Sequence, residues 1–160
     1  MKHKQSNAVG IVFSVLAIAL VGGLVWFIWS NSLLNQLESG LRSQAVAEAL
    51  GRFFRWLLGE DSRFAHYIMQ NVRKVAHAVE FAALGAAAVL LLTALRRVHA
   101  HMLLHAAGAV LAVAVADEAI QIFTGRGAMV QDVLLDFAGG MVGLLAMLLL
   151  RALFRALFRR

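Results

Sequence analysis

Apolar residues fill four long runs of this chain, and polar stretches separate the runs. The runs cover residues 8–29, 75–95, 102–122 and 132–150. A bilayer core about 30 Å thick needs about 20 helical residues at about 1.5 Å each, so every run is long enough to cross it. The pattern therefore predicts an all-α fold, a bundle of four transmembrane helices.

The first run has a second interpretation, because Lys2 and Lys4 precede it as basic residues precede the core of a signal peptide. Its apolar stretch is longer than the roughly 7–15 residues of a signal core. No clear pair of small residues marks a cleavage site after it. We therefore expect this run to remain in the protein as the first transmembrane helix.

The composition agrees with a membrane protein. The chain has 160 residues, of which 61% are hydrophobic, and this leaves too little polar material to cover a water-soluble domain. Its length suits a single domain over residues 1–160. The chain contains no cysteine, which excludes disulfides, thiolate metal sites and a cysteine nucleophile.

Basic residues mark one side of the predicted bundle. Lys2 and Lys4 precede the first run, Arg96 and Arg97 join the second to the third, and four arginines follow the fourth. The positive-inside rule places these segments, and so both termini, in the cytoplasm. The net charge of +6 then reflects topology and attraction to anionic lipids, and we expect no nucleic-acid partner.

The longest polar stretch, residues 30–74, is extracytoplasmic on this topology. Within it, residues 41–59 have the spacing of an amphipathic helix that lies along the membrane surface, with Trp56 at the interface. A further helix is expected to begin near Asp61 and to run into the second transmembrane helix. This outer loop either closes the bundle or gates a site that lipids reach.

Polar residues within the spans occupy single faces of three helices, in the half of the bundle that the topology places outside. Arg73, where the second helix enters the membrane, shares one face with His77 and Glu80. Asp117 and Gln121 share a face of the third helix, and Asp132 and Asp136 share a face of the fourth. Because a charge that faces lipid is costly, these faces should turn toward one another and enclose a polar chamber. Lys74, Glu118 and Arg126 complete the expected ligand-binding set.

Two glycines, Gly139 and Gly143, continue the face of the fourth helix that carries Asp132 and Asp136. A GxxxG pair lets two helices approach closely, either within one bundle or in a dimer. We expect close packing within the bundle, which would close the chamber toward the cytoplasm.

The predicted chamber holds more acid than base, because five carboxylates face three cations, Arg73, Lys74 and Arg126. Crowded carboxylates do not all stay ionised, so two of them would need a proton, a metal or a cationic ligand group. This imbalance favours a functional site over structural ion pairs alone. His77 with several carboxylates suits a divalent metal, but such ligands do not select one, and we predict neither a metal nor another cofactor.

Two segments resemble the VanZ-like family of membrane proteins: RKVAHAVEF at 73–81 and DEAIQIFTGRGAMVQDVLLDFAGGMVG at 117–143, with a weaker match at SGLRS, 39–43. Two positions depart from the family pattern, since Phe81 stands where tyrosine is frequent and Asp136 where asparagine is common. The resemblance implies a small integral protein of a bacterial cell membrane. The family's namesake is linked to resistance to teicoplanin, a glycopeptide antibiotic with a lipid tail.

Three functions remain open for such a chamber. It would bind the head group of a membrane lipid, a lipid-linked cell-envelope molecule or a lipid-tailed glycopeptide antibiotic, and so contribute to resistance. It would alternatively be an acid/base hydrolase or transferase for a lipid-linked substrate, with His77, Glu80 and Asp117 as catalytic residues. The third alternative is a scaffold for cell-envelope enzymes. His101 and His105, four residues apart, are expected at the membrane interface rather than on a metal.

Overall fold

The computed structural model describes residues 2–33, 44, 48–49, 51–53, 55–57, 59, 62–125, 127 and 129–158. Helices contain most of these residues, and no strand occurs among them. The labelled helices are α1 (Lys2–Ser32), α3 (Arg63–Gln70), α4 (Val72–Ala94), α5 (Ala100–Phe123) and α6 (Val130–Phe158). The prediction of an all-α fold is confirmed.

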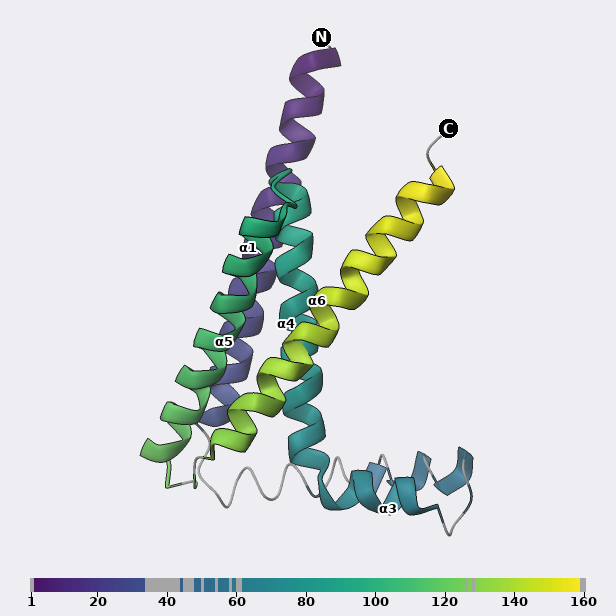
Figure 1. Ribbon diagram of the computed structural model, residues 1–160, viewed down its shortest axis with the longest axis vertical. Coiled ribbons are helices and arrows are strands. Elements are labelled where there is room, and N and C mark those ends of the chain that lie inside the picture. The colour runs from purple at the N-terminus through teal and green to yellow at the C-terminus, as the bar shows by residue number, and fades with distance from the viewer. Residues whose placement is uncertain are drawn as a thin grey trace.

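Four long helices, α1, α4, α5 and α6, pack side by side as a bundle (Figure 1). Each contains a segment that is long and apolar enough to cross a membrane: Val9–Ser32, Val72–Ala94, Ala100–Phe123 and Val130–Phe158. The predicted transmembrane bundle is confirmed. α6 continues past the predicted end at residue 150, because the following Leu, Ala and Arg residues are strong helix formers.

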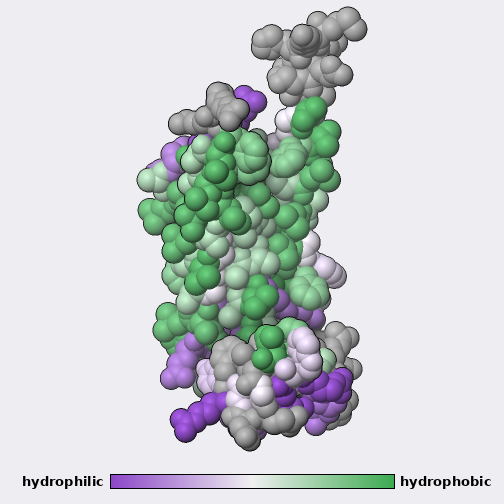
Figure 2. All heavy atoms as spheres, turned by 90° about the vertical axis from the view of Figure 1, so that its right-hand side faces the viewer, coloured by the Kyte–Doolittle hydropathy of each residue, from purple (hydrophilic) through white to green (hydrophobic). Residues whose placement is uncertain are grey.

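The two ends of the bundle differ. α1 begins and α6 ends at one end, and α3 lies across the other (Figure 1). Apolar side chains cover much of the long helices, whereas hydrophilic side chains gather next to α3 (Figure 2). Trp26, Leu104, Leu145 and Phe154 are among the large apolar side chains that are exposed. Such a surface suits contact with lipid, so the chain is a multi-pass membrane protein.

The bundle has a small apolar core. Ile28 of α1, Phe81 and Leu84 of α4, and Val110 and Ala114 of α5 form its buried centre. Val133 and Phe137 of α6 pack against these residues. This core packs the four helices against one another next to the polar residues of α4, α5 and α6.

The most extensive helix contact joins α4 to α6. Gly139 and Gly143 lie against Ala78 and Ala82, and a methyl group on either glycine would overlap a carbonyl oxygen of α4. Glycine has no side chain, so the two backbones can approach this closely. The prediction that these glycines pack within the bundle is confirmed.

The chain changes direction between α3 and α4. Asn71 lies between the two helices with φ −116° and ψ 20°, and its Nδ2 donates a hydrogen bond to the Tyr67 carbonyl oxygen at 3.0 Å. An asparagine side chain that bonds to nearby backbone competes with regular helix. The predicted further helix is therefore present as α3, which begins at Arg63 and ends at Gln70, but a break at Asn71 separates it from the second span. Its predicted start, Asp61, lies outside the described residues.

The predicted surface helix at 41–59 is described only in part. Its described residues between 44 and 57 are helical, and Arg55 Nη1 lies 3.3 Å from the sulfur of Met69 in α3. This segment therefore packs against α3, while Trp56 is exposed. The other residues of the predicted helix lie outside the described part of the chain. Whether the loop closes the bundle or gates a site stays a prediction.

Candidate functional site

Polar side chains are buried at the end of the bundle next to α3, which we call the polar end. Asp117, Glu118 and Gln121 of α5 and Asp136 of α6 are all less than a tenth exposed. Asp117 and Gln121 are four residues apart, so one face of α5 carries both toward the bundle. Buried polar groups need partners, and the contacts of these residues show what each one does.

A chain of hydrogen bonds begins at Arg73 in α4. Its Nη2 donates to Gln121 Oε1 at 2.7 Å, and Gln121 Nε2 donates to Asp117 Oδ2 at 2.9 Å. The guanidinium of Arg73 is therefore linked to the Asp117 carboxylate through the side-chain amide of Gln121. This arrangement fixes the orientation of the Asp117 carboxylate, because both ends of the amide are engaged.

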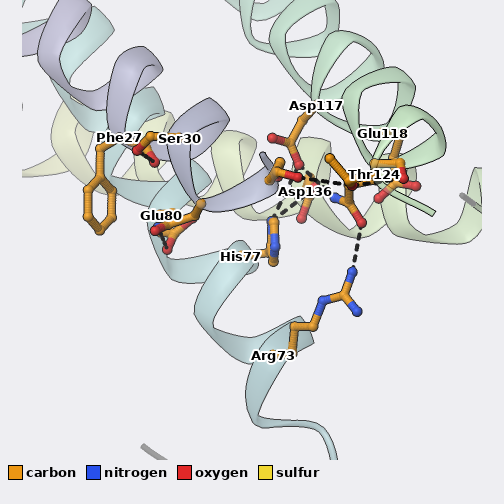
Figure 3. A network of polar contacts seen from close by, with 12 residues as sticks. Phe27, Ser30, Arg73, His77, Glu80, Asp117, Glu118, Thr124 and Asp136 are labelled. Carbon is orange, nitrogen blue, oxygen red and sulfur yellow. Dashed lines mark hydrogen bonds and ion pairs between the residues drawn. The ribbon is translucent and has the colours of Figure 1, made fainter. Parts of the chain in front are cut away.

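His77 connects this chain of hydrogen bonds to α6. His77 Nδ1 lies 3.6 Å from Asp117 Oδ2 and 3.9 Å from Asp136 Oδ2, and Figure 3 shows the imidazole directed at both carboxylates. We call Arg73, His77, Asp117, Gln121 and Asp136 the polar cluster. The expectation that polar faces of α4, α5 and α6 turn toward one another is confirmed for these residues.

Glu80 lies beside the polar cluster but has a different partner. Asn31 Nδ2 of α1 donates to Glu80 Oε1 at 3.1 Å. Sequence reasoning missed Asn31, because it treated residues after 29 as outer loop. The sequence does indicate Asn31 in one way, because it is a polar residue at the end of the first span, at the level of the predicted chamber. Glu80 was predicted to be catalytic together with His77 and Asp117. In the structure its side chain is instead held by Asn31 of α1.

Glu118 has a structural contact. Its Oε2 accepts a hydrogen bond from the backbone N–H of Met129 at 3.1 Å. Met129 immediately precedes α6, so this bond ties the connection between α5 and α6 to the bundle. A second tie joins α5 to α1, since Thr124 Oγ1 donates to the Ser32 carbonyl oxygen at 3.2 Å.

Lys74 and Asp132 form a separate ion pair. Lys74 Nζ lies 2.8 Å from Asp132 Oδ1, and the lysine side chain is 44% exposed. This pair joins the first turn of α4 to the first turn of α6, near the surface of the polar end. Arg126, the remaining predicted ligand-binding residue, lies outside the described residues.

A groove runs along the surface between α4 and α6. Its volume is about 450 Å³, and its lining includes Tyr67, Asn71, Lys74, Val79, Leu135 and Val142. The polar members lie at the end near α3, and the apolar members continue toward the middle of the bundle. His77 and Asp136 do not line the groove. Periodicity had not predicted it, because α3 supplies Tyr67 from outside the spans.

Fold and site together define a class: a multi-pass helical membrane protein with a buried polar cluster at one end. The model of the VanZ/LLP1 family matches residues 13–151, a range that extends from α1 into α6. The chain therefore belongs to the VanZ/LLP1 family, as the sequence resemblance indicated. Searches of curated proteins and of solved structures gave no significant match.

Proposed function

We propose that this VanZ/LLP1 protein binds an amphipathic molecule, with an alkyl tail in the groove between α4 and α6 and a polar head at the polar end. The groove carries the proposal, because polar residues lie at only one of its ends. From Asn71 to Ala82 it extends roughly 16 Å along α4, at about 1.5 Å per residue. That length suits an extended acyl chain.

The chemistry of the groove's polar end favours an anionic head group. Lys74 is partly exposed even while it pairs with Asp132, and an ammonium group has three donor hydrogens. The Tyr67 side chain is exposed beside it and carries a hydroxyl donor. A phosphate or carboxylate would accept hydrogen bonds from both groups, while the tail replaces lipid in the groove.

We place the polar end on the extracytoplasmic side of a bacterial cell membrane, because the basic termini favour the cytoplasm. The ligand then belongs to the outer leaflet. Two sources share the required chemistry of tail and anionic head: lipids or lipid-linked envelope precursors, and lipid-tailed glycopeptides such as teicoplanin. Binding of the second kind would contribute to antibiotic resistance.

The contact between His77 and Asp117 favours one alternative, an acid/base hydrolase or transferase acting on a lipid-linked substrate. A histidine 3.6 Å from a buried carboxylate is an arrangement that can accept and release a proton. In this alternative the groove still positions the substrate. Turnover of a lipid-linked substrate by purified protein, abolished in His77→Gln, would support catalysis in addition to binding.

Filling the groove tests the proposed function. Val142 and Leu145 are similarly exposed on α6, but only Val142 lines the groove. Val142→Trp should weaken the affinity of the purified protein for lipid, measured by native mass spectrometry, by roughly tenfold, equivalent to about 1.4 kcal/mol. Leu145→Trp is the matched control and should retain it.

Competition then identifies the source of the ligand. Teicoplanin added to the wild-type protein should displace the bound lipid if both occupy the groove. A teicoplanin derivative without its tail should displace much less, because the groove takes the tail. Equal lipid retention in Val142→Trp and Leu145→Trp would reject the groove as the binding site.

A further inference from the structure

We propose that His77, Asp117 and Asp136 bind one divalent transition-metal cation of the Zn²⁺ or Mn²⁺ class. One nitrogen and two carboxylate oxygens, from three helices, all lie within 4.8 Å of one another. The site does not depend on the proposed function, because neither His77 nor Asp136 lines the groove.

The distances fit ligands of a single ion. A cation bound at about 2.0–2.2 Å from each ligand atom separates any two of those atoms by at most about 4.4 Å. His77 Nδ1 lies 3.6 Å from the Asp117 carboxylate and 3.9 Å from the Asp136 carboxylate. Both distances lie below that limit.

Charge favours a divalent ion at this position. Within the described part of the chain, neither Asp117 nor Asp136 forms an ion pair with a lysine or arginine: Arg73 bonds to Gln121, and Lys74 bonds to Asp132. When both carboxylates are ionised and the imidazole of His77 is neutral, the three groups carry a charge of −2. A buried charge without a counterion is costly, and one divalent cation balances this pair.

The second carboxylate oxygen of Asp117 supplies an independent observation. The Asp117 side chain is fully buried, and its Oδ1 has no hydrogen-bond partner among the residues that the structure describes. Buried oxygens normally have a partner. Gln121 donates a single hydrogen bond to Oδ2, so the Asp117 carboxylate keeps unused lone pairs on both of its oxygens that a metal could bind.

The residues around the three ligands resemble the support that metal sites require. Metal-binding carboxylates are usually oriented by hydrogen bonds from a second layer of residues, and the amide of Gln121, held by Arg73, provides one for Asp117. The tight contact of Gly139 with Ala78 fixes α4 against α6 next to His77 and Asp136. The three ligands are therefore positioned before a metal arrives.

The donor set indicates which ions fit. Mg²⁺ and Ca²⁺ prefer oxygen ligands throughout, whereas imidazole suits transition metals such as Zn²⁺. One imidazole with two carboxylates therefore favours Zn²⁺ or Mn²⁺. Three protein ligands also leave a coordination position for water or a ligand group.

Metal titration of the full-length protein in detergent tests the site. The protein is stripped with a chelator, dialysed, and titrated with Zn²⁺ or Mn²⁺, and bound metal is counted by mass spectrometry. We expect one equivalent per wild-type chain and at least a tenfold weaker affinity in Asp136→Asn and His77→Gln. Mg²⁺ at the same concentration should not compete.

Two matched variants serve as controls. Asp132→Asn removes a carboxylate four positions before Asp136. His105→Gln removes a histidine at the other end of α5, whose ring lies next to that of His101 with a centroid separation of 4.3 Å. Both should keep the wild-type equivalent. A failure to bind one equivalent in the wild type would overturn the proposal, and so would weaker binding in the controls than in Asp136→Asn and His77→Gln.

A spectroscopic measurement on the wild type removes the dependence on variant folding. Pulsed electron paramagnetic resonance of the Mn²⁺-loaded protein should detect coupling to a single imidazole nitrogen. Manganese bound without a nitrogen ligand would overturn the site. Because the probe is the metal alone, this result is separate from lipid binding in the groove, which the Trp variants measure.

Discussion

At the residue scale, the buried side chains of the polar end have separate roles that their shared location conceals. Glu118 holds the start of α6 through the Met129 N–H, and Glu80 holds α1 through Asn31. Asp117 and Asp136, in contrast, converge on His77. We therefore assign stability to the first pair of acids and binding chemistry to the second.

The hydrogen bond from the Met129 N–H to Glu118 should contribute to the stability of the protein. Glu118→Ala should lower the free energy of unfolding by about 1–3 kcal/mol, because the partly buried hydrogen bond from the Met129 N–H to a carboxylate is lost. Glu118→Gln retains an acceptor oxygen and should lose clearly less. Unfolding in mixed detergent micelles measures both. Equal losses in the two variants would show that the charge of Glu118, rather than its hydrogen bond, stabilises the connection.

Periodicity predicts which polar residues come close together, but not which residue each of them forms a hydrogen bond with. The spacing of Arg73, His77 and Glu80 places them on one face of α4, and burial then turns that face inward. The partner of Glu80 depends on where Asn31 lies across the bundle. No spacing within one helix contains that information, because it arises from packing between α1 and α4.

At the element scale, the contact between α4 and α6 sets the geometry of the site. Gly139 and Gly143 let the backbones meet, and His77 and Asp136 lie beside that contact. The GxxxG spacing is visible in the sequence, so this contact could be predicted. The break at Asn71 could not, because residues 61–74 contain neither proline nor glycine to mark it.

A methyl group added at the contact between α4 and α6 should weaken that contact. Gly143→Ala should destabilise the protein by about 1–3 kcal/mol, because the new methyl group overlaps the Ala82 carbonyl oxygen and forces the helices apart. Gly108→Ala in α5 is the control, since no atom lies within 4 Å of the added methyl group. That variant should be neutral or slightly more stable. Equal stability of the two variants would contradict a tight α4–α6 contact.

At the scale of the whole molecule, the bundle combines an apolar surface, a buried polar cluster and a groove on one side. Hydropathy alone predicts the four spans, since each helix must satisfy its backbone within the membrane. The groove requires the direction of α3 and the crossing of α6 over α4 (Figure 1). These follow from tertiary packing, which no single segment of the sequence specifies.

Photocrosslinking from within the membrane tests whether the groove is occupied selectively. A benzophenone side chain at Val79 would lie in the groove. The same group at Val115, which is similarly exposed on α5, would contact bulk lipid. Both positions are seven or eight residues from the polar ends of their helices, so they sample a similar depth.

Mass spectrometry of the adducts formed in cell membranes gives the result. The probe at Val79 should capture one class of molecule with an anionic head, and Lys74→Gln should reduce this adduct severalfold. The probe at Val115 should capture lipids in proportion to their abundance in the membrane. The same abundance-weighted mixture at both positions would contradict selective binding in the groove.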